Sequence, residues 1–130
     1  MPIDLPPGYT PTGAEAFMNP LQAEYFRRKL QRLRANARRE LVAEPLGADQ
    51  NDREGDQTDQ ASAAEDREFG LINRERAHAL LAEIDQALAR LDNGTFGYCE
   101  DTGEPIDLRR LEAQPTATLT TAAQAAREQR

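Results

Sequence analysis

Acidic side chains gather in one segment of this 130-residue chain, between Ala48 and Glu68. Eight Asp and Glu occur there against two Arg, a net −6 of the chain's −7. The segment separates two helical apolar patterns, so we expect it to form the bend of a helical hairpin and to hold its carboxylates at the far end. From composition alone, such a cluster is typical of a solvated turn. An acidic tip on a rigid rod is also suited to reach into a partner.

The run from Cys99 to Gly103 has the loop chemistry of a zinc knuckle, in which two thiolates with two residues between them hold one side of a tetrahedral ion. Here the second position is Thr102. A structural zinc site needs about four nitrogen or sulfur ligands, whereas this region supplies one thiol and no histidine. We therefore expect no structural zinc and no other cofactor, and a loop held by packing and hydrogen bonds.

Catalysis by this chain is not expected. Cys99 and His78, the only cysteine and the only histidine, fall on different predicted elements, and no glycine-rich loop that could cradle a phosphate is present. We interpret His78 as a solvated helix residue and Cys99 as a small, partly buried residue rather than a sensor. A single cysteine cannot form an intramolecular disulfide, which agrees with a reducing compartment.

Two helical patterns position the acidic segment. Asn19 offers a helix cap followed by Pro20, and the second pattern ends at Asn93-Gly94. The apolar positions of the first pattern are Leu21, Phe26, Leu30, Leu33, Ala37 and Leu41. Those of the second are Phe69, Ile72, Ala77, Leu80, Leu81, Ile84, Leu88 and Leu91. Two such stripes joined by a polar turn pair most simply as an antiparallel coiled coil.

Pro45 and Gly47 interrupt the first pattern, so its helix should kink or stop near Glu44. At about 1.5 Å per residue the hairpin would extend on the order of 45 Å. Because the stripes are consumed within the hairpin, we expect a monomer.

The remaining segments predict a small body at the base of the hairpin. Residues 1–18 are rich in Pro and Gly, which block regular structure, and are expected to form an N-terminal arm packing on the body. Residues 94–130 contain strand or turn signals and then an Ala-rich stretch expected to be helix. The predicted fold is therefore mostly α, with a coiled-coil hairpin over 19–93, its acidic tip near 48–68, and a degenerate zinc-finger-like region with a C-terminal helix over 94–130.

Charge and hydropathy limit the partners. A pI near 4.8 argues against a tight, sequence-independent grip on nucleic acid, because phosphates repel an acidic surface. The sequence has neither a secretory signal nor an apolar run long enough to span a bilayer, so we expect a cytoplasmic protein without membrane contact.

The chain resembles the DksA/TraR family of bacterial transcription factors in four stretches. These are FMNP with YFRRKL near the start, DQTDQA at 56–61, FGYCEDTG at 96–103 and RRLEAQPTATL at 109–119. Their order and spacing are more specific than any coiled-coil pattern. At the positions where the four-cysteine branch has its zinc ligands the chain has Cys99, Thr102, Thr120 and Ala123. This pattern is similar to the zinc-independent members of the family, so Phe96, Leu108, Leu111 and Leu119 would have to supply compensating apolar contacts.

The resemblance implies a stringent-response type of regulator that binds RNA polymerase directly and represses ribosomal RNA promoters. Such proteins insert their coiled coil through the secondary channel toward the catalytic magnesium and alter the stability of promoter open complexes, without contacting promoter sequence. The tip residues implied are Asp56, Asp59 and Ala61, and Arg76 resembles a polymerase-contacting position. Arg76 is equally well an ordinary exposed helix arginine.

The alarmone ppGpp is the implied signalling partner, bound at a shared interface through basic side chains. Here Glu83, Gln114 and Gln124 stand where the family offers Lys or Arg. Since phosphates require cationic partners, we expect the response to ppGpp to be weakened. The alternative interpretation is a coiled-coil adaptor without transcriptional activity.

Overall fold

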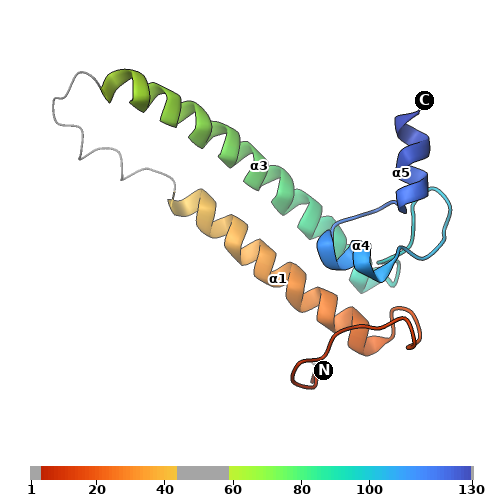
Figure 1. Cartoon of the computed structure of the whole chain (residues 1–130). Coiled ribbons are helices and arrows are strands. Elements are labelled where there is room, and N and C mark those ends of the chain that lie inside the picture. Colours follow the sequence, from red (N-terminus) through yellow and green to blue (C-terminus); the bar gives the residue numbers. More distant parts are fainter. Residues whose placement is uncertain (1–3, 44–58, 130) are drawn as a thin grey trace. The chain divides into compact units, whose positions relative to one another are not determined.

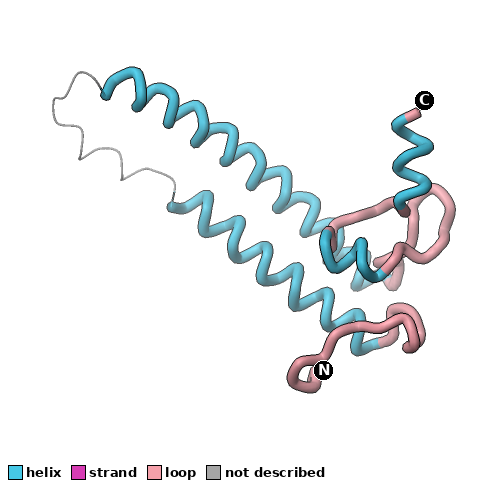
Figure 2. The backbone as a smooth tube through the Cα atoms, viewed as in Figure 1, coloured by secondary structure: helices cyan, strands magenta, loops and turns pink. Residues whose placement is uncertain are grey.

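A computed structural model describes residues 4–43 and 59–129 of the chain. Four helices follow one another in it: α1 (Pro20–Ala43), α3 (Asp59–Asn93), α4 (Leu108–Ala113) and α5 (Thr121–Glu128), as Figure 1 shows. The described ranges contain no strand, only an isolated bridge between Tyr98 and Pro105 (Figure 2). The mostly α fold expected from the sequence is confirmed. None of the described helices has the length and apolar character needed to cross a membrane.

The predicted ends of the two long helices are observed. Asn19 caps α1, because its side-chain Oδ1 accepts a hydrogen bond from the Gln22 amide at 2.8 Å. At the other end, α3 stops at Asn93 and Gly94 takes a left-handed φ of 81°, a conformation that suits glycine at a helix end. The acidic segment lies partly outside the described residues, but its part over 59–68 is helical and forms the start of α3 rather than a bend.

The chain divides into two compact units. A body unit comprises Met1–Arg32 and Ile84–Arg130, and a hairpin unit comprises Leu33–Glu83. The division runs through α1 and α3, so each unit contains an antiparallel pair of segments from these helices (Figure 1).

The body unit has the larger core. Phe26 of α1 packs on Phe96 with ring centroids 5.5 Å apart, and Arg27 bridges to Asp92 of α3 at 3.1 Å. The other buried apolar residues are Leu30, Ile84, Ala87, Leu91, Cys99, Ile106, Leu111, Ala117, Leu119 and Ala123. Of the four residues expected to compensate for a missing metal, Phe96, Leu111 and Leu119 are buried, whereas Leu108 is half-buried.

The hairpin unit is thinly packed by comparison. Among its described residues only Ala37 and Ala77 are fully buried. Val42, Leu71 and Ile72 are exposed. The expectation that Ile72 belongs to the buried stripe is wrong, because its side chain remains 46% accessible to solvent.

The N-terminal segment packs on the body unit through aromatic rings. Tyr9 lies edge-on to Tyr25 of α1, and Phe17 lies edge-on to Tyr98. Gly97, with φ 88°, lies so close to the side chains of Phe17 and Met18 that a Cβ at this position would be 3.1 Å from each of them.

Gln22 anchors the same segment from inside. Its side chain is fully buried, accepts the Met18 amide at 2.7 Å, and donates to the Thr12 carbonyl and the Glu15 carboxylate. Glu15 also accepts the Thr12 amide at 3.0 Å, and this bond first, followed by the bond from Gln22, holds the pKa of Glu15 below its ordinary value.

Residues 95–129 fold as turns and two short helices. The expected C-terminal helix is observed as α5, but α4 was not predicted. Asp107 starts α4 by accepting the Arg109 amide at 3.0 Å. Glu112 ties α4 to α1, because its carboxylate accepts from Tyr25 at 2.9 Å and Lys29 at 2.7 Å. Burial, followed by the hydrogen bond to Glu112 and the negative charge of its carboxylate, raises the pKa of Tyr25 to about 12.

Candidate functional site

The residues predicted at the acidic tip are only partly described. Asp56 lies outside the described residues, and so do the side chains of Asp59 and Ala61, whose backbones form the first turn of α3. Arg76 and His78 lie further along α3 with exposed side chains. The roles assigned to Asp56, Asp59, Ala61 and Arg76 therefore stay predictions.

The knuckle around Cys99 is fully described. Two backbone hydrogen bonds close it, from the Cys99 amide to the Glu104 carbonyl at 2.8 Å and from the Gly103 amide to the Cys99 carbonyl at 2.9 Å. Gly103 takes a φ of 75°, which lets the chain reverse. The turn places Thr102 beside the Cys99 thiol, and the Thr102 hydroxyl accepts the Glu104 amide at 3.2 Å.

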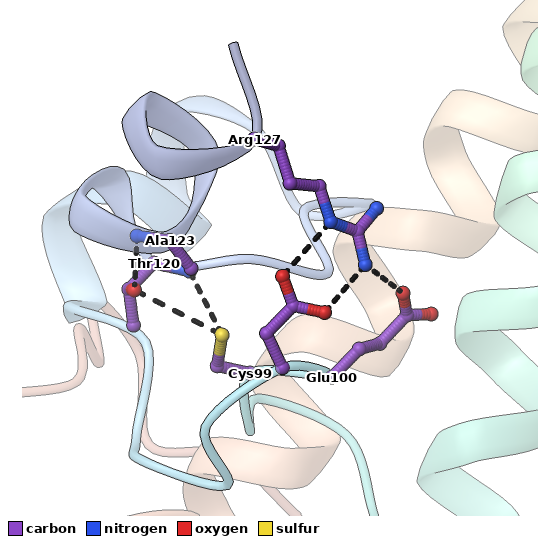
Figure 3. Close-up of polar contacts among 6 residues, drawn as sticks. Cys99, Glu100, Thr120, Ala123 and Arg127 are labelled. Atoms are coloured by element: carbon purple, nitrogen blue, oxygen red, sulfur yellow. Dashed lines mark hydrogen bonds and ion pairs between the residues drawn. The ribbon is translucent and has the colours of Figure 1, made fainter. Parts of the chain in front are cut away.

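Thr120 brings α5 to the same sulfur. Its amide and its hydroxyl approach the Cys99 Sγ at 3.4 Å and 3.8 Å, as Figure 3 shows. The same hydroxyl oxygen caps α5 by accepting the Ala123 amide at 3.1 Å. A continuous chain of hydrogen bonds thus runs from Ala123 through Thr120 to Cys99.

Cys99 is buried, with only 3% of its surface exposed. Burial opposes ionisation of the thiol, but hydrogen bonds from the Thr102 hydroxyl and from the amides of Thr120, Thr102 and Asp101 outweigh it. Together they lower the pKa of Cys99 from 9.0 to about 6. The sulfur is therefore a hydrogen-bond acceptor, in an environment that favours its ionised form.

Two arginines support this arrangement. Arg127 of α5 binds the Asp101 carboxylate through two hydrogen bonds, of 2.8 Å and 2.5 Å, and lies 3.8 Å from Glu100 (Figure 3). Hydrogen bonding to Asp101 raises the pKa of Arg127. Arg110 of α4 donates to the Leu119 carbonyl at 2.8 Å and to the Gln124 side chain. Arg127 therefore joins α5 to the turn that contains Asp101, and Arg110 joins α4 to α5 and to the segment just before it.

Sequence reasoning missed Arg110 and Arg127. Each interacts with a group that is distant in sequence, Arg127 with a residue 26 positions away, so no local pattern could have paired them. The N-cap of α5 could have been predicted from the sequence, because Thr120 stands directly before a helix-forming stretch.

A zinc ion does not fit these residues. Two hydroxyls and an alanine accompany the single thiol, and no group of three or more His, Cys, Asp or Glu suited to a metal occurs in the described parts of the chain. In addition, the one sulfur already accepts hydrogen bonds from Thr120. The donor set favours a hydrogen-bonded site over a metal site.

The three positions expected to weaken ppGpp binding are all exposed. Gln114 caps the end of α4 with its amide on the Arg110 carbonyl, and Gln124 accepts from the Arg110 side chain and donates to Glu128. Glu83 lies on the part of α3 that belongs to the hairpin unit.

Two families of known sequences match consecutive parts of the chain. Residues 22–91 match the N-terminal domain of the DnaK suppressor protein DksA, and residues 94–129 match the prokaryotic dksA/traR C4-type zinc finger. Among relatives, the RNA polymerase-binding transcription factor DksA of Caulobacter vibrioides is 45% identical over 124 residues, 94% of this chain and 87% of the relative. The Escherichia coli protein of the same name is 36% identical over 113 residues, covering 85% of this chain and 74% of the relative.

Two solved structures of proteins with related names are similar to this chain. The transcription factor DksA2 from Pseudomonas aeruginosa is similar with a TM-score of 0.76 and 39% identity, covering 92% of this chain and 91% of that one. The RNA polymerase-binding regulator Dks from Chlamydia trachomatis shares the fold, with a TM-score of 0.51 at 22% identity.

Proposed function

The chain belongs to the DksA/TraR family, and from that premise we propose that it regulates transcription by binding RNA polymerase directly. The observation that carries the proposal is the match of both family domains, in order, over nearly the whole chain, together with 45% identity to a relative named for polymerase binding. The relatives are named as transcription factors, which favours a regulator over an enzyme.

The mode of action we propose is insertion of the coiled-coil tip into the secondary channel of polymerase. Asp56 and Asp59 would bring carboxylates near the catalytic magnesium, with Ala61 as the small residue beside them. Carboxylates in such a place change the position and hydration of charged groups around the metal, which shifts the stability of promoter open complexes. Complexes of marginal stability, such as those at ribosomal RNA promoters, would then be lost. Arg76 is the proposed additional contact to polymerase, since it is exposed on α3.

We further propose that the protein works without structural zinc, as a cytoplasmic monomer that contacts no promoter sequence. The support for zinc independence is the donor set at Cys99, Thr102, Thr120 and Ala123, which offers one thiol where a C4-type finger needs four. A weakened response to ppGpp is supported by Glu83, Gln114 and Gln124, none of which supplies the positive charge that phosphates require.

The test is in vitro transcription from a ribosomal RNA promoter with purified polymerase and chelator-treated protein. The tip variant replaces Asp56→Asn and Asp59→Asn; the matched control replaces Asp49→Asn and Asp52→Asn, which removes the same charge from the same acidic segment. We expect inhibition by the wild type and by the control, and loss of inhibition by the tip variant although it still binds polymerase.

Two outcomes would contradict the proposal. Equal loss in both variants would show that overall charge matters rather than the tip pair. Absence of both binding and inhibition in the wild type would leave the alternative, a coiled-coil adaptor that shares the fold without the activity.

A further inference from the structure

The body unit must hold α5 in place with the residues it has at the four ligand positions of the family finger. These positions contain Cys99, Thr102, Thr120 and Ala123, and the sulfur of Cys99 is in hydrogen-bond contact with Thr120. Thr120 reaches Sγ through its amide and its hydroxyl, at 3.4 Å and 3.8 Å. Thr102 stands in the turn that follows Cys99, and its hydroxyl accepts the Glu104 amide at 3.2 Å. Ala123 joins through its amide, which donates to the Thr120 hydroxyl oxygen at 3.1 Å.

We propose that the Cys99 sulfur, acting as a shared hydrogen-bond acceptor, takes over the cross-linking role that a metal ion has in the four-cysteine branch. We call Cys99, Thr102, Thr120 and Ala123 the sulfur clamp. This inference rests on membership of the family and on the ligand positions carried over by resemblance, and it adds the means by which a finger with one thiol keeps its C-terminal helix.

The chemistry of the clamp resembles that of a metal site with the donors and acceptors exchanged. In a zinc finger, several sulfurs donate electron pairs to one central cation. In the sulfur clamp, the N–H and the O–H of Thr120 point at one central sulfur, which is best as an acceptor when ionised. The lowered pKa of Cys99 agrees with such an environment. Arg127, which binds Asp101 of the same turn, adds a positive charge that favours the ionised sulfur.

The clamp fixes one end of α5, and a second contact fixes the other. Thr120 is the N-cap of α5, whereas Arg127 lies in its last turn and binds Asp101 through two hydrogen bonds. Asp101 belongs to the same turn as Cys99. A helix of eight residues is too short to be stable alone, so α5 depends on being held at both ends.

Hydrogen exchange of the full-length, metal-free protein tests the proposal. Cys99→Ala removes the acceptor and Cys99→Ser keeps a smaller one. We expect the Thr120 and Ala123 amides to exchange about tenfold faster in Cys99→Ala, with a smaller change in Cys99→Ser. Amides of α1 within the body unit serve as the internal reference. Unchanged exchange at Thr120 would overturn the proposal.

A pair of threonine variants separates the clamp from ordinary helix capping. Thr120→Val removes the hydroxyl, and Thr120→Ser keeps it. Thr121→Val makes the same change at the next residue, which is exposed. We expect the pH at which the ultraviolet absorbance of the Cys99 thiolate appears to rise in Thr120→Val and to stay the same in the other two. A role limited to capping would leave that pH unchanged in all three variants.

Rebuilding the metal site gives an independent measurement. If the four positions converge, the combination of Thr102→Cys, Thr120→Cys and Ala123→Cys should bind one zinc ion per chain and slow exchange in α5. The wild type should take up no zinc under the same conditions. Failure of the rebuilt chain to bind zinc, or uptake of one equivalent by the wild type, would contradict the clamp. These readings use the isolated chain, so they are independent of any result in the transcription assay.

Discussion

The body unit and the hairpin unit bury their apolar residues very differently. The body encloses Phe26, Phe96, Ile84 and other large side chains, whereas in the described part of the hairpin unit only Ala37 and Ala77 are fully buried. Three of the four large apolar residues exposed in the described chain lie in the hairpin unit. Because buried apolar area is the main source of stability, the difference teaches that the body unit contributes most of the stability of the described fold, while the hairpin unit leaves large apolar side chains exposed.

The largest test of this contrast is truncation of a body side chain. Phe26→Ala should lower the free energy of unfolding by about 3–5 kcal/mol, because Phe26 is fully buried among aromatic rings. Leu71→Ala in the hairpin unit, where Leu71 is 58% exposed, should change it by less than about 0.5 kcal/mol. Urea unfolding followed by circular dichroism measures both. Similar losses in the two variants would break the comparison.

A backbone substitution tests the tightest approach within the body. Gly97→Ala should cost about 2–3 kcal/mol, since it combines a left-handed φ with a Cβ 3.1 Å from Phe17 and Met18. Gly103→Ala is the matched control: its φ is 75° but nothing lies within 4 Å of the added Cβ, so a loss of roughly 1 kcal/mol is expected from backbone strain alone. Thermal unfolding of both variants measures the difference, and equal shifts would show that the contact with Phe17 and Met18 is not tight.

A buried polar anchor provides the next test. Gln22→Leu should cost about 1–2 kcal/mol, because the Met18 amide and the Thr12 carbonyl lose their hydrogen bonds to Gln22 and the Glu15 carboxylate loses one of its donors. Gln31→Leu, at an exposed position of the same helix, should have little effect. Limited proteolysis would show whether the N-terminal segment is released. A protected segment in Gln22→Leu would mean that the aromatic contacts suffice to hold it.

The pH dependence of stability probes the sulfur within the body. The pKa of Cys99 is about 6 in the fold and 9.0 ordinarily, so its ionisation stabilises the fold fully above about pH 9 and loses that effect as the pH falls through 6. The advantage of the wild type over Cys99→Ser should therefore grow from pH 6 to pH 9. Urea unfolding of both proteins at several pH values measures this difference in stability, because the titration of all other groups affects the two proteins alike. A constant difference would contradict the assignment.

The smallest effect on stability is expected at the tip. Asp56→Asn with Asp59→Asn should leave the free energy of unfolding within about 0.5 kcal/mol of the wild type, although we expect the same variant to lose transcriptional inhibition. Thermal unfolding beside the transcription assay separates the two properties. A large loss of stability would show that the tip carboxylates serve the fold.

Much of the fold was predictable because its signals are local. Asn19, Pro20 and Gly94 fix the ends of α1 and α3 through capping and left-handed backbone geometry, which depend on a few neighbouring residues. Burial was predicted less well, because it depends on the partner surface. Ile72 fits the helical stripe yet is exposed, and Gln22 is polar yet fully buried.

The candidate sites show the same division. Counting ligands at Cys99 was enough to argue against zinc, but the hydrogen bonds from Thr120 join residues 21 positions apart and required the fold. The short helix α4 was missed because its six residues carry little periodicity. The tip pair Asp56 and Asp59 rests on the family spacing, which the described residues do not test.

Gly97 has a consequence for how mutational scans of this protein are interpreted. With φ at 88° and two side chains against it, almost every substitution there should impair folding and thereby reduce activity. A scan scored by growth would rank Gly97 beside residues that meet a partner, and abundance would have to be measured in parallel to tell them apart. Loss of abundance on substitution of Gly97 would report the contact between the N-terminal segment and the turn before Cys99, rather than contact with a partner.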